Sequence, residues 1–151
     1  MQVTISVLLI SIIEAMLYDF HFRCRKFIWE GVSEIGEDAL AYIRSKRIDK
    51  FARYIDSARK HNLFHDEHGD IYEQLDLLKR IRNRIHIQNE SSDLEPNEID
   101  AFTPARKIIA EQVLERVMKI MAVRFPRPAH AQGFVADFQL PWDEHYHHQA
   151  N

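Results

Sequence analysis

Residues 71–86 read IYEQLDLLKRIRNRIH, a pattern that indicates one long amphipathic helix. At 100° per residue the apolar positions share one face, and they are Ile71, Leu75, Leu78 and Ile85. Arg82 falls in the middle of this face and His86 at its edge, whereas Arg80 and Arg84 fall on the opposite, solvent side. Because Arg82 and His86 are four residues apart, their side chains are expected to be neighbours.

The segments around this stretch carry ordinary helix signals. Asp70, three residues before Glu73, imitates a capping box, so the helix is predicted to span about 70–89. The Thr-Pro pair at 103–104 supplies an N-cap and a first-turn proline. It predicts a last helix that continues to about Arg124.

The N-terminal half predicts further helices, because it contains few glycines and prolines. One helix is expected over 4–29, where apolar residues recur at helical spacing. A second stretch is expected over 37–61, with a break near Ser45. The predicted fold is therefore all-α, an up-and-down bundle of four to five helices.

The chain of 151 residues fits one domain. The helical domain is expected over 1–128, followed by an irregular C-terminal tail over 129–151 that contains a short strand at 134–140. Cys24 is the only cysteine, so no disulfide can form within the chain, and a reducing compartment is expected. We interpret Cys24 as a packed core thiol.

Charge and hydropathy bound the class of partner. The formal net charge of -3 gives no global attraction to nucleic acid or anionic lipid, so nucleic-acid binding would require a local basic patch. The apolar run at 3–13 is shorter than the 20 or so residues that span a bilayer, and it lacks the flanks of a signal peptide. These observations predict a cytoplasmic protein without a membrane partner.

The cluster around Arg82 points to phosphate chemistry. A buried, unpaired guanidinium costs several kcal/mol, so Arg82 needs either a carboxylate, with Glu14 and Asp19 as candidates, or an anionic ligand. The imidazole of His86 titrates near neutral pH and can transfer a proton, and Asn83 can orient a phosphate oxygen. An arginine and a histidine are the minimum set for RNA cleavage without a metal or cofactor, in which the 2′-hydroxyl attacks the adjacent phosphorus.

Residues 75–86, LDLLKRIRNRIH on the penultimate long helix of a small bundle, resemble the signature helix of HEPN domains. That signature is an arginine, usually followed by a polar residue, with a histidine a few positions on. The resemblance implies a homodimer whose two motif helices form a composite cleft. It also implies a metal-independent endoribonuclease of a toxin–antitoxin or defence system, with a nucleotidyltransferase-like antitoxin as partner. Other members of the family keep the fold without the activity.

Two registers of the motif remain open. From Arg82 and Asn83 the histidine arrives one residue sooner than is usual in the family. From Arg80 the spacing to His86 fits, but Ile81 then takes the polar position. Because the helical wheel favours Arg82, Arg82, Asn83 and His86 are the expected catalytic residues, with Arg80 as second candidate.

Weaker signals support other interpretations. A non-catalytic helical module, which dimerises or binds a partner or nucleotide, would use Arg82 as a structural ion-pair residue. The stretch 37–61 carries a basic face that could guide RNA phosphates, although acidic residues interrupt it. Two histidine groups, at 61–68 and 145–148, lack the cysteine or carboxylate partners typical of zinc sites, so no metal is expected.

Overall fold

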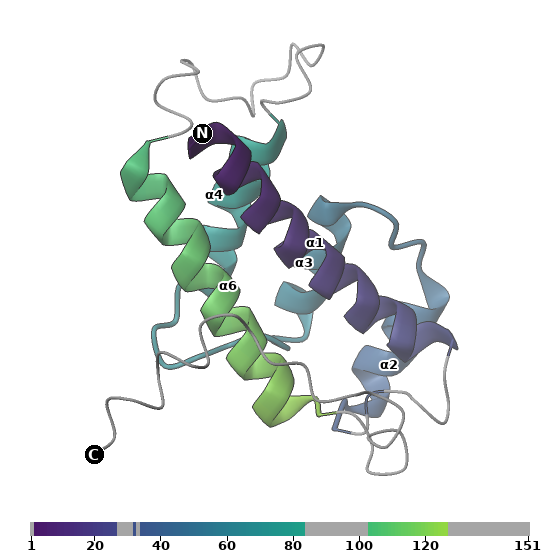
Figure 1. The fold of residues 1–151 in the computed structure, drawn as a ribbon. Helices are drawn as coiled ribbons and strands as arrows, with labels where there is room; N and C mark the ends of the chain where they lie inside the picture. The colour runs from purple at the N-terminus through teal and green to yellow at the C-terminus, as the bar shows by residue number, and fades with distance from the viewer. Residues whose placement is uncertain (1, 27–31, 33, 84–102, 127–151) are drawn as a thin grey trace, which may run out of the picture.

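A computed structural model of the chain describes residues 2–26, 32, 34–83 and 103–126, and within these ranges it contains helices and no strand (Figure 1). The helices are α1 (Gln2–Lys26), α2 (Glu37–Ser45), α3 (Phe51–Lys60), α4 (Ile71–Asn83) and α6 (Pro104–Arg124). The predicted all-α bundle is therefore confirmed. The strand expected at 134–140 and the boundary of the tail lie outside the described residues.

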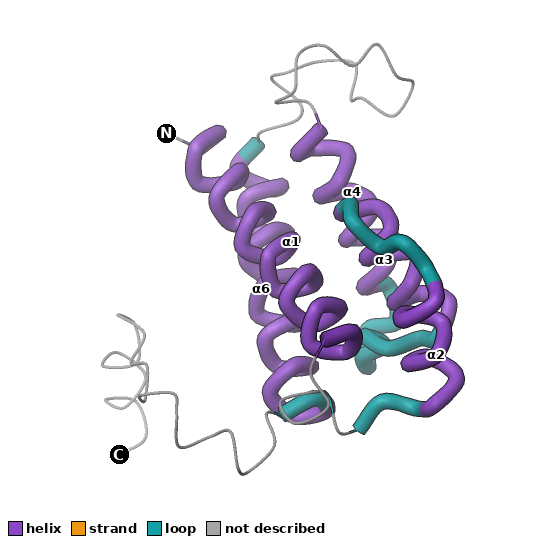
Figure 2. The backbone as a smooth tube through the Cα atoms, turned by 90° about the vertical axis from the view of Figure 1, so that its right-hand side faces the viewer, coloured by secondary structure: helices purple, strands orange, loops and turns teal. Residues whose placement is uncertain are grey.

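Helix α1 is the centre of the bundle and contacts each of the other four helices. Both α1 and α6 begin at the end of the bundle where α4 ends, so α1 and α6 run side by side in the same direction and α4 runs against them (Figures 1 and 2). The face of α1 that meets its neighbours is fully buried at Ile13, Leu17 and Phe20. Its position is therefore set by burial of apolar surface.

Helix α1 is also apolar enough to resemble a membrane span. The stretch Ile5–Lys26 is long and apolar enough to cross a bilayer, although only 33% of its most apolar window is buried inside the bundle. The run at 3–13 thus belongs to an apolar stretch that continues to Lys26. A core helix and an N-terminal signal sequence pass the same test of length and composition, and α1 contacts the four other helices.

The predicted break near Ser45 is confirmed. Lys46 and Lys50 have extended backbone, so the chain leaves α2 and starts α3 in a new direction. Ile48, between them, is buried with Ile43 of α2. The break therefore allows the connection 46–50 to bury Ile48, while the polar faces of α2 and α3 stay toward solvent.

A Schellman motif ends α3. Asn62 takes the left-handed conformation at φ 49°, the Leu63 N–H donates to the Ala58 carbonyl at 2.9 Å, and the Asn62 N–H donates to the Arg59 carbonyl at 3.1 Å. Buried Tyr72 of α4 fastens the same corner, because its hydroxyl donates to the Ala58 carbonyl and accepts from a backbone N–H of the connection, both at 3.0 Å. The end of α3 and the start of α4 are thus held together.

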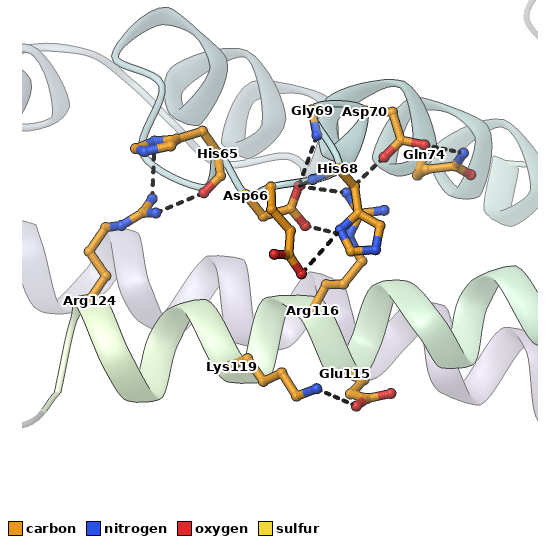
Figure 3. A network of polar contacts seen from close by, with 11 residues as sticks. His65, Asp66, His68, Gly69, Asp70, Gln74, Glu115, Arg116, Lys119 and Arg124 are labelled. Atoms are coloured by element: carbon orange, nitrogen blue, oxygen red, sulfur yellow. Dashed lines mark hydrogen bonds and ion pairs between the residues drawn. The ribbon is translucent and has the colours of Figure 1, made fainter.

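Ion pairs join the connection at 61–70 to α6 (Figure 3). Arg116 of α6 donates to both carboxylate oxygens of Asp66, including an Nη2–Oδ1 bond of 2.9 Å, and its Nη2 also donates to Asp70 at 2.8 Å. Near the end of α6, Arg124 donates to the carbonyls of Leu63 and His65. Two arginines of α6, Arg116 and Arg124, therefore hold the connection against the last helix.

The helix starts at 71 and 104 were predicted from local signals. At Thr103 the side chain accepts a hydrogen bond from Arg106 N at 3.3 Å, which confirms the N-cap. Helix α4 begins at Ile71 as expected, but the capping box is wrong: the Asp70 carboxylate accepts from Gln74 and Arg116, and no reciprocal pair with Glu73 occurs among the described residues.

Candidate functional site

The Arg82 guanidinium lies against the Glu14 carboxylate, between the last turn of α4 and the middle of α1. Its Nη2 contacts Glu14 Oε2 at 3.1 Å and Oε1 at 3.3 Å. The Arg82 side chain keeps 32% of its surface exposed and Glu14 keeps 23%. One NH2 group makes both contacts, and Nε and Nη1 have no partner among the described residues. Glu14 thus orients the guanidinium, and part of its surface stays exposed.

Of the two predicted acidic partners, one meets the arginine and the other does not. Glu14 pairs with Arg82, as predicted. Asp19 lies one turn further along α1 and pairs with Arg23 at 2.9 Å, with 54% of its side chain exposed. Among the described residues Asp19 thus pairs with a cation on its own helix at i+4 and not with Arg82. A supporting role for Asp19 toward His86 stays a prediction.

The buried face of α4 is wider than the one that the helical wheel predicted. Tyr72 and Ile81 are buried together with Ile71, Leu75 and Leu78. At 100° per residue Tyr72 and Ile81 lie on opposite flanks of the predicted stripe, so Arg82 keeps its place near the middle of the face. Arg82 is half-buried in the last turn of α4, and Arg80, expected on the solvent side, is half-buried as well.

The remaining motif residues lie at or beyond the end of α4. Asn83 is half-buried and is the last residue of the helix. Arg84, Ile85 and His86 lie outside the described residues. The predicted neighbourhood of Arg82 and His86 therefore stays a prediction, and the part of the cluster with known geometry is Glu14, Arg82 and Asn83.

Several other sequence signals have structural roles. Among the described residues no group of three or more His, Cys, Asp and Glu side chains is placed to hold a metal ion. His65 contacts the Asn62 carbonyl and Arg124, whereas His61 packs on the Tyr42 ring, so these histidines face separate partners. Cys24 is buried at 1% exposure, and burial raises the pKa of its thiol to about 12, which confirms a packed core thiol.

Aspartates partly neutralise the basic face of α2 and α3. Asp49 pairs with Arg47 at 2.6 Å and Arg53 at 2.9 Å, and its hydrogen bond with Arg47 lowers the pKa of the Asp49 carboxyl. Arg59 pairs with Asp56 and with Asp76 of α4. The cations of this face therefore act first as structural ion-pair partners.

An aromatic pocket beside the C-terminal half of α1 was not predicted from the sequence. It has a volume of about 50 Å³ and lies where α1, α2, the connection 46–50 and α3 meet. Its lining residues are Tyr18, His21, Phe22, Arg25, Ile43, Ile48 and Tyr54. Four lining residues lie on one face of α1, about one turn apart, and this spacing was the only sign of the pocket in the sequence. Tyr54, Ile43 and Ile48 come from later segments of the chain, which no local pattern connects to α1.

His21 is the unusual residue of this pocket. It is buried at 2% exposure, and its Nδ1 donates to the Leu17 carbonyl at 2.7 Å. Burial lowers the pKa of His21 to about 4, so the ring is neutral at pH 7 and carries its proton on Nδ1. Its Nε2 is then a lone-pair acceptor, and it has no hydrogen-bond partner among the described residues.

Two arginines fasten the same end of α1 to α2. Arg25 Nε donates to the Ile43 carbonyl at 3.3 Å, and Arg44 Nε donates to the Cys24 carbonyl at 3.1 Å. Each arginine thus satisfies a carbonyl in the last turn of the other helix. The bond from Arg25 uses Nε, and its two NH2 groups have no partner among the described residues around the pocket that Arg25 lines.

Comparison with known proteins adds no relative to these observations. No known family model, curated protein or solved structure matches the chain. The likeness to HEPN domains therefore rests on residues 75–86 and the helical architecture alone.

Proposed function

We propose that the chain is a metal-independent endoribonuclease of a toxin–antitoxin or defence system, which cleaves RNA at a cleft between two copies. The observation that carries this proposal is Arg82, a partly exposed guanidinium held by Glu14 at the end of α4. Its partial exposure leaves the guanidinium open to an anionic ligand in addition to Glu14. Because Glu14 already orients the Arg82 side chain, Arg82 can stabilise the negative charge of a phosphate without a further loss of side-chain freedom.

The motif residues divide the reaction among them in this proposal. His86 serves either as the general base that takes the proton from the 2′-hydroxyl or as the general acid that protonates the departing 5′-oxygen, and water takes the other role. The O2′–P bond forms and the P–O5′ bond breaks, which leaves a 2′,3′-cyclic phosphate and a 5′-hydroxyl. Arg82 stabilises the charge that builds on the phosphoryl oxygens, and Asn83 orients the scissile group. Arg80, half-buried one position before Ile81, is the second candidate for the phosphate contact.

The homodimer in this proposal is supported by exposed apolar side chains on α1 and α6. Leu8 is 59% exposed and Ile12 is 40% exposed, one turn apart on α1, and Ile108 near the start of α6 is 51% exposed. Large apolar side chains in water favour association. This part of the bundle is also where α4 ends, so pairing here would bring two copies of the Arg82 site together. A nucleotidyltransferase-like antitoxin and a cytoplasmic location belong to the same proposal.

A non-catalytic helical module is the second candidate, and the ion pair itself favours it. Glu14 already neutralises Arg82, and an arginine with a carboxylate at 3.1 Å is complete as a structural contact. The same fold would then dimerise or bind a partner or nucleotide.

Cleavage of a labelled single-stranded RNA in excess EDTA separates the two candidates. We expect the wild type to cut the RNA, and Arg82→Ala and His86→Ala to lose at least 100-fold in rate with unchanged far-UV circular dichroism. His68→Ala and Arg47→Ala serve as matched controls, because both side chains are exposed and far from Arg82 in sequence.

Expression tests the biological part of the proposal. The wild type should slow growth of the host cell, and either motif variant should restore it. A wild-type protein that cuts no RNA and is harmless on expression contradicts the enzyme and favours the binding module. Cleavage that EDTA abolishes contradicts the metal-independent mechanism.

A further inference from the structure

The aromatic pocket and the Arg82 site lie next to each other along α1. Glu14 and Tyr18 are four residues apart on one helix, so their side chains are neighbours on the same face. Tyr54, which lines the pocket, has its pKa raised by burial, by Tyr18 and by the negative charge of Glu14. A strand of nucleic acid that contacts Arg82 through one phosphate would therefore pass the pocket with an adjoining nucleotide.

The pocket offers an exposed aromatic surface. Tyr18 is 51% exposed and Phe22 is 36% exposed, and their rings stack at 5.8 Å between centroids with an angle of 25°. Tyr54 meets Tyr18 edge to face at 6.2 Å and lies 5.2 Å from the His21 ring. Exposed, mutually braced rings of this kind are the surface on which unpaired bases stack.

The inner edge of the pocket offers one acceptor and a set of donors. The acceptor is the lone pair of His21 Nε2, buried and without a partner among the described residues. The donors are the NH2 groups of Arg25. A nucleobase carries the complementary pair, an N–H beside a ring nitrogen or carbonyl oxygen, along its Watson–Crick edge. Apolar peptide side chains have no group for the buried nitrogen.

From these contacts we infer that the pocket binds an unpaired RNA base, which stacks on the exposed Tyr18 ring and donates a hydrogen bond to His21 Nε2. The volume of about 50 Å³ admits the polar edge of the base, while the rest of the ring lies on the exposed aromatic surface. Arg25 contacts an acceptor on the same edge or the adjoining phosphate. The assignment of RNA as the ligand rests on the proposed function, whereas the base-binding geometry rests on the pocket alone.

The test measures binding rather than cleavage. The probes are a fluorescent hexanucleotide of 2′-O-methyluridine, which cannot undergo attack by the 2′-oxygen, and the same backbone with abasic sugars. We expect the wild type to bind the hexanucleotide at least tenfold more tightly than the abasic strand, a difference of roughly 1.4 kcal/mol. Tyr18→Leu should remove most of that difference and leave binding of the abasic strand unchanged.

Matched variants keep the test independent of folding. Tyr18 is half exposed, so Tyr18→Leu should fold, as judged by circular dichroism. Tyr42→Leu makes the same change on α2 at a ring that packs against His61 and Lys60 outside the pocket, and it should bind like the wild type. His21→Phe fills the ring position without an acceptor and should also weaken base binding.

The outcomes separate this inference from the proposed function. Equal affinity of the wild type for the two strands, or an unchanged preference in Tyr18→Leu, overturns the base pocket even if the protein cleaves RNA. Tight base-dependent binding without cleavage by the wild type supports the pocket and contradicts the ribonuclease. A weaker effect of Tyr18→Leu than of Tyr42→Leu also overturns the assignment.

Discussion

Arg82 and Glu14 are 68 residues apart in the sequence, and a single NH2 group of the arginine joins them across α4 and α1. The contact uses one of the three nitrogen atoms of the guanidinium. Its stabilising effect is also small, because ion pairs that water reaches contribute about 1 kcal/mol or less. The pair thus orients a cation without strongly anchoring the fold.

Replacing Glu14 by Gln should therefore separate orientation from stability. We expect a change in the free energy of unfolding of about 1 kcal/mol or less. If Arg82 acts on phosphate, kcat should fall by roughly tenfold, and Glu14→Asp should restore part of it, since a shorter carboxylate still pairs with the guanidinium. Asp56→Asn, which breaks an exposed pair with Arg59 on α3, should leave kcat unchanged. A fall in stability of several kcal/mol would make Glu14 a structural residue first.

Exposed apolar residues on α1 should govern self-association. Ile12→Glu places a charge at a 40% exposed position of the proposed dimer face, so it should shift the protein from dimer to monomer in sedimentation velocity. Val123→Glu makes the same change at an 83% exposed position near the far end of α6 and should leave the dimer intact. A wild type that sediments as a monomer at micromolar concentration contradicts this prediction.

Burial of neutral His21 makes stability depend on pH. The pKa of His21 is about 4 in the fold and about 6.5 in the unfolded chain, so only the unfolded state takes up a proton between these values. The stabilisation is complete above pH 6.5 and is lost as the pH falls toward 4. Urea titrations should show the free energy of unfolding decrease by roughly 3 kcal/mol from pH 7 to pH 4, and His21→Phe should flatten this slope. His68→Gln, at an exposed site, should retain it.

The Arg116 network should dominate the response to stronger acid. Hydrogen bonds from Arg116 lower the pKa of the Asp66 carboxyl, and hydrogen bonds from Gln74 and Arg116 lower the pKa of the Asp70 carboxyl. Both carboxylates therefore stabilise the fold fully above the unfolded pKa of about 3.9, and this stabilisation is lost as the pH falls through their lowered values.

Replacing Arg116 by Met should leave Asp66 without its cation at 14% side-chain exposure. We expect a loss of about 2 kcal/mol, less than the 3–5 kcal/mol that breaking a fully buried pair costs. The melting temperature, measured by circular dichroism at pH 7, reports the loss. Lys119→Met on the outer face of the same helix should change stability by less than about 0.5 kcal/mol. Equal effects of the two variants would contradict the structural role of the network.

Local signals predicted the helices well, because caps and breaks depend on neighbouring residues. Thr103 and Pro104 start α6, and the chain breaks after Ser45, as the sequence indicated. The pairing of Arg82 with a carboxylate of the first helix also followed from the cost of burying a cation. Which carboxylate Arg82 meets, and how far the buried face of α4 extends to include Tyr72 and Ile81, depends on the packing of other helices.

Contacts between distant segments were beyond the reach of the sequence pattern. The pair of Asp66 with Arg116, which ties the connection 61–70 to α6, spans 50 residues. The aromatic pocket likewise joins α1 to Tyr54 of α3 and to two isoleucines. In the sequence alone Tyr18, His21 and Phe22 cannot be distinguished from other residues of an apolar helix, because the partners that form the pocket come from α2, α3 and the connection between them.

The arrangement of α1 has a consequence for synthesis of the protein. Its most extensive contact is with α6. Helix α6 leaves the ribosome about a hundred residues after α1. At about 5–20 residues per second, α1 waits on the order of 5–20 s before that partner exists. During this interval an apolar helix of bilayer-spanning length is uncovered. The nascent chain should therefore be a client of ribosome-associated chaperones, and truncation before residue 104 should yield an aggregating fragment.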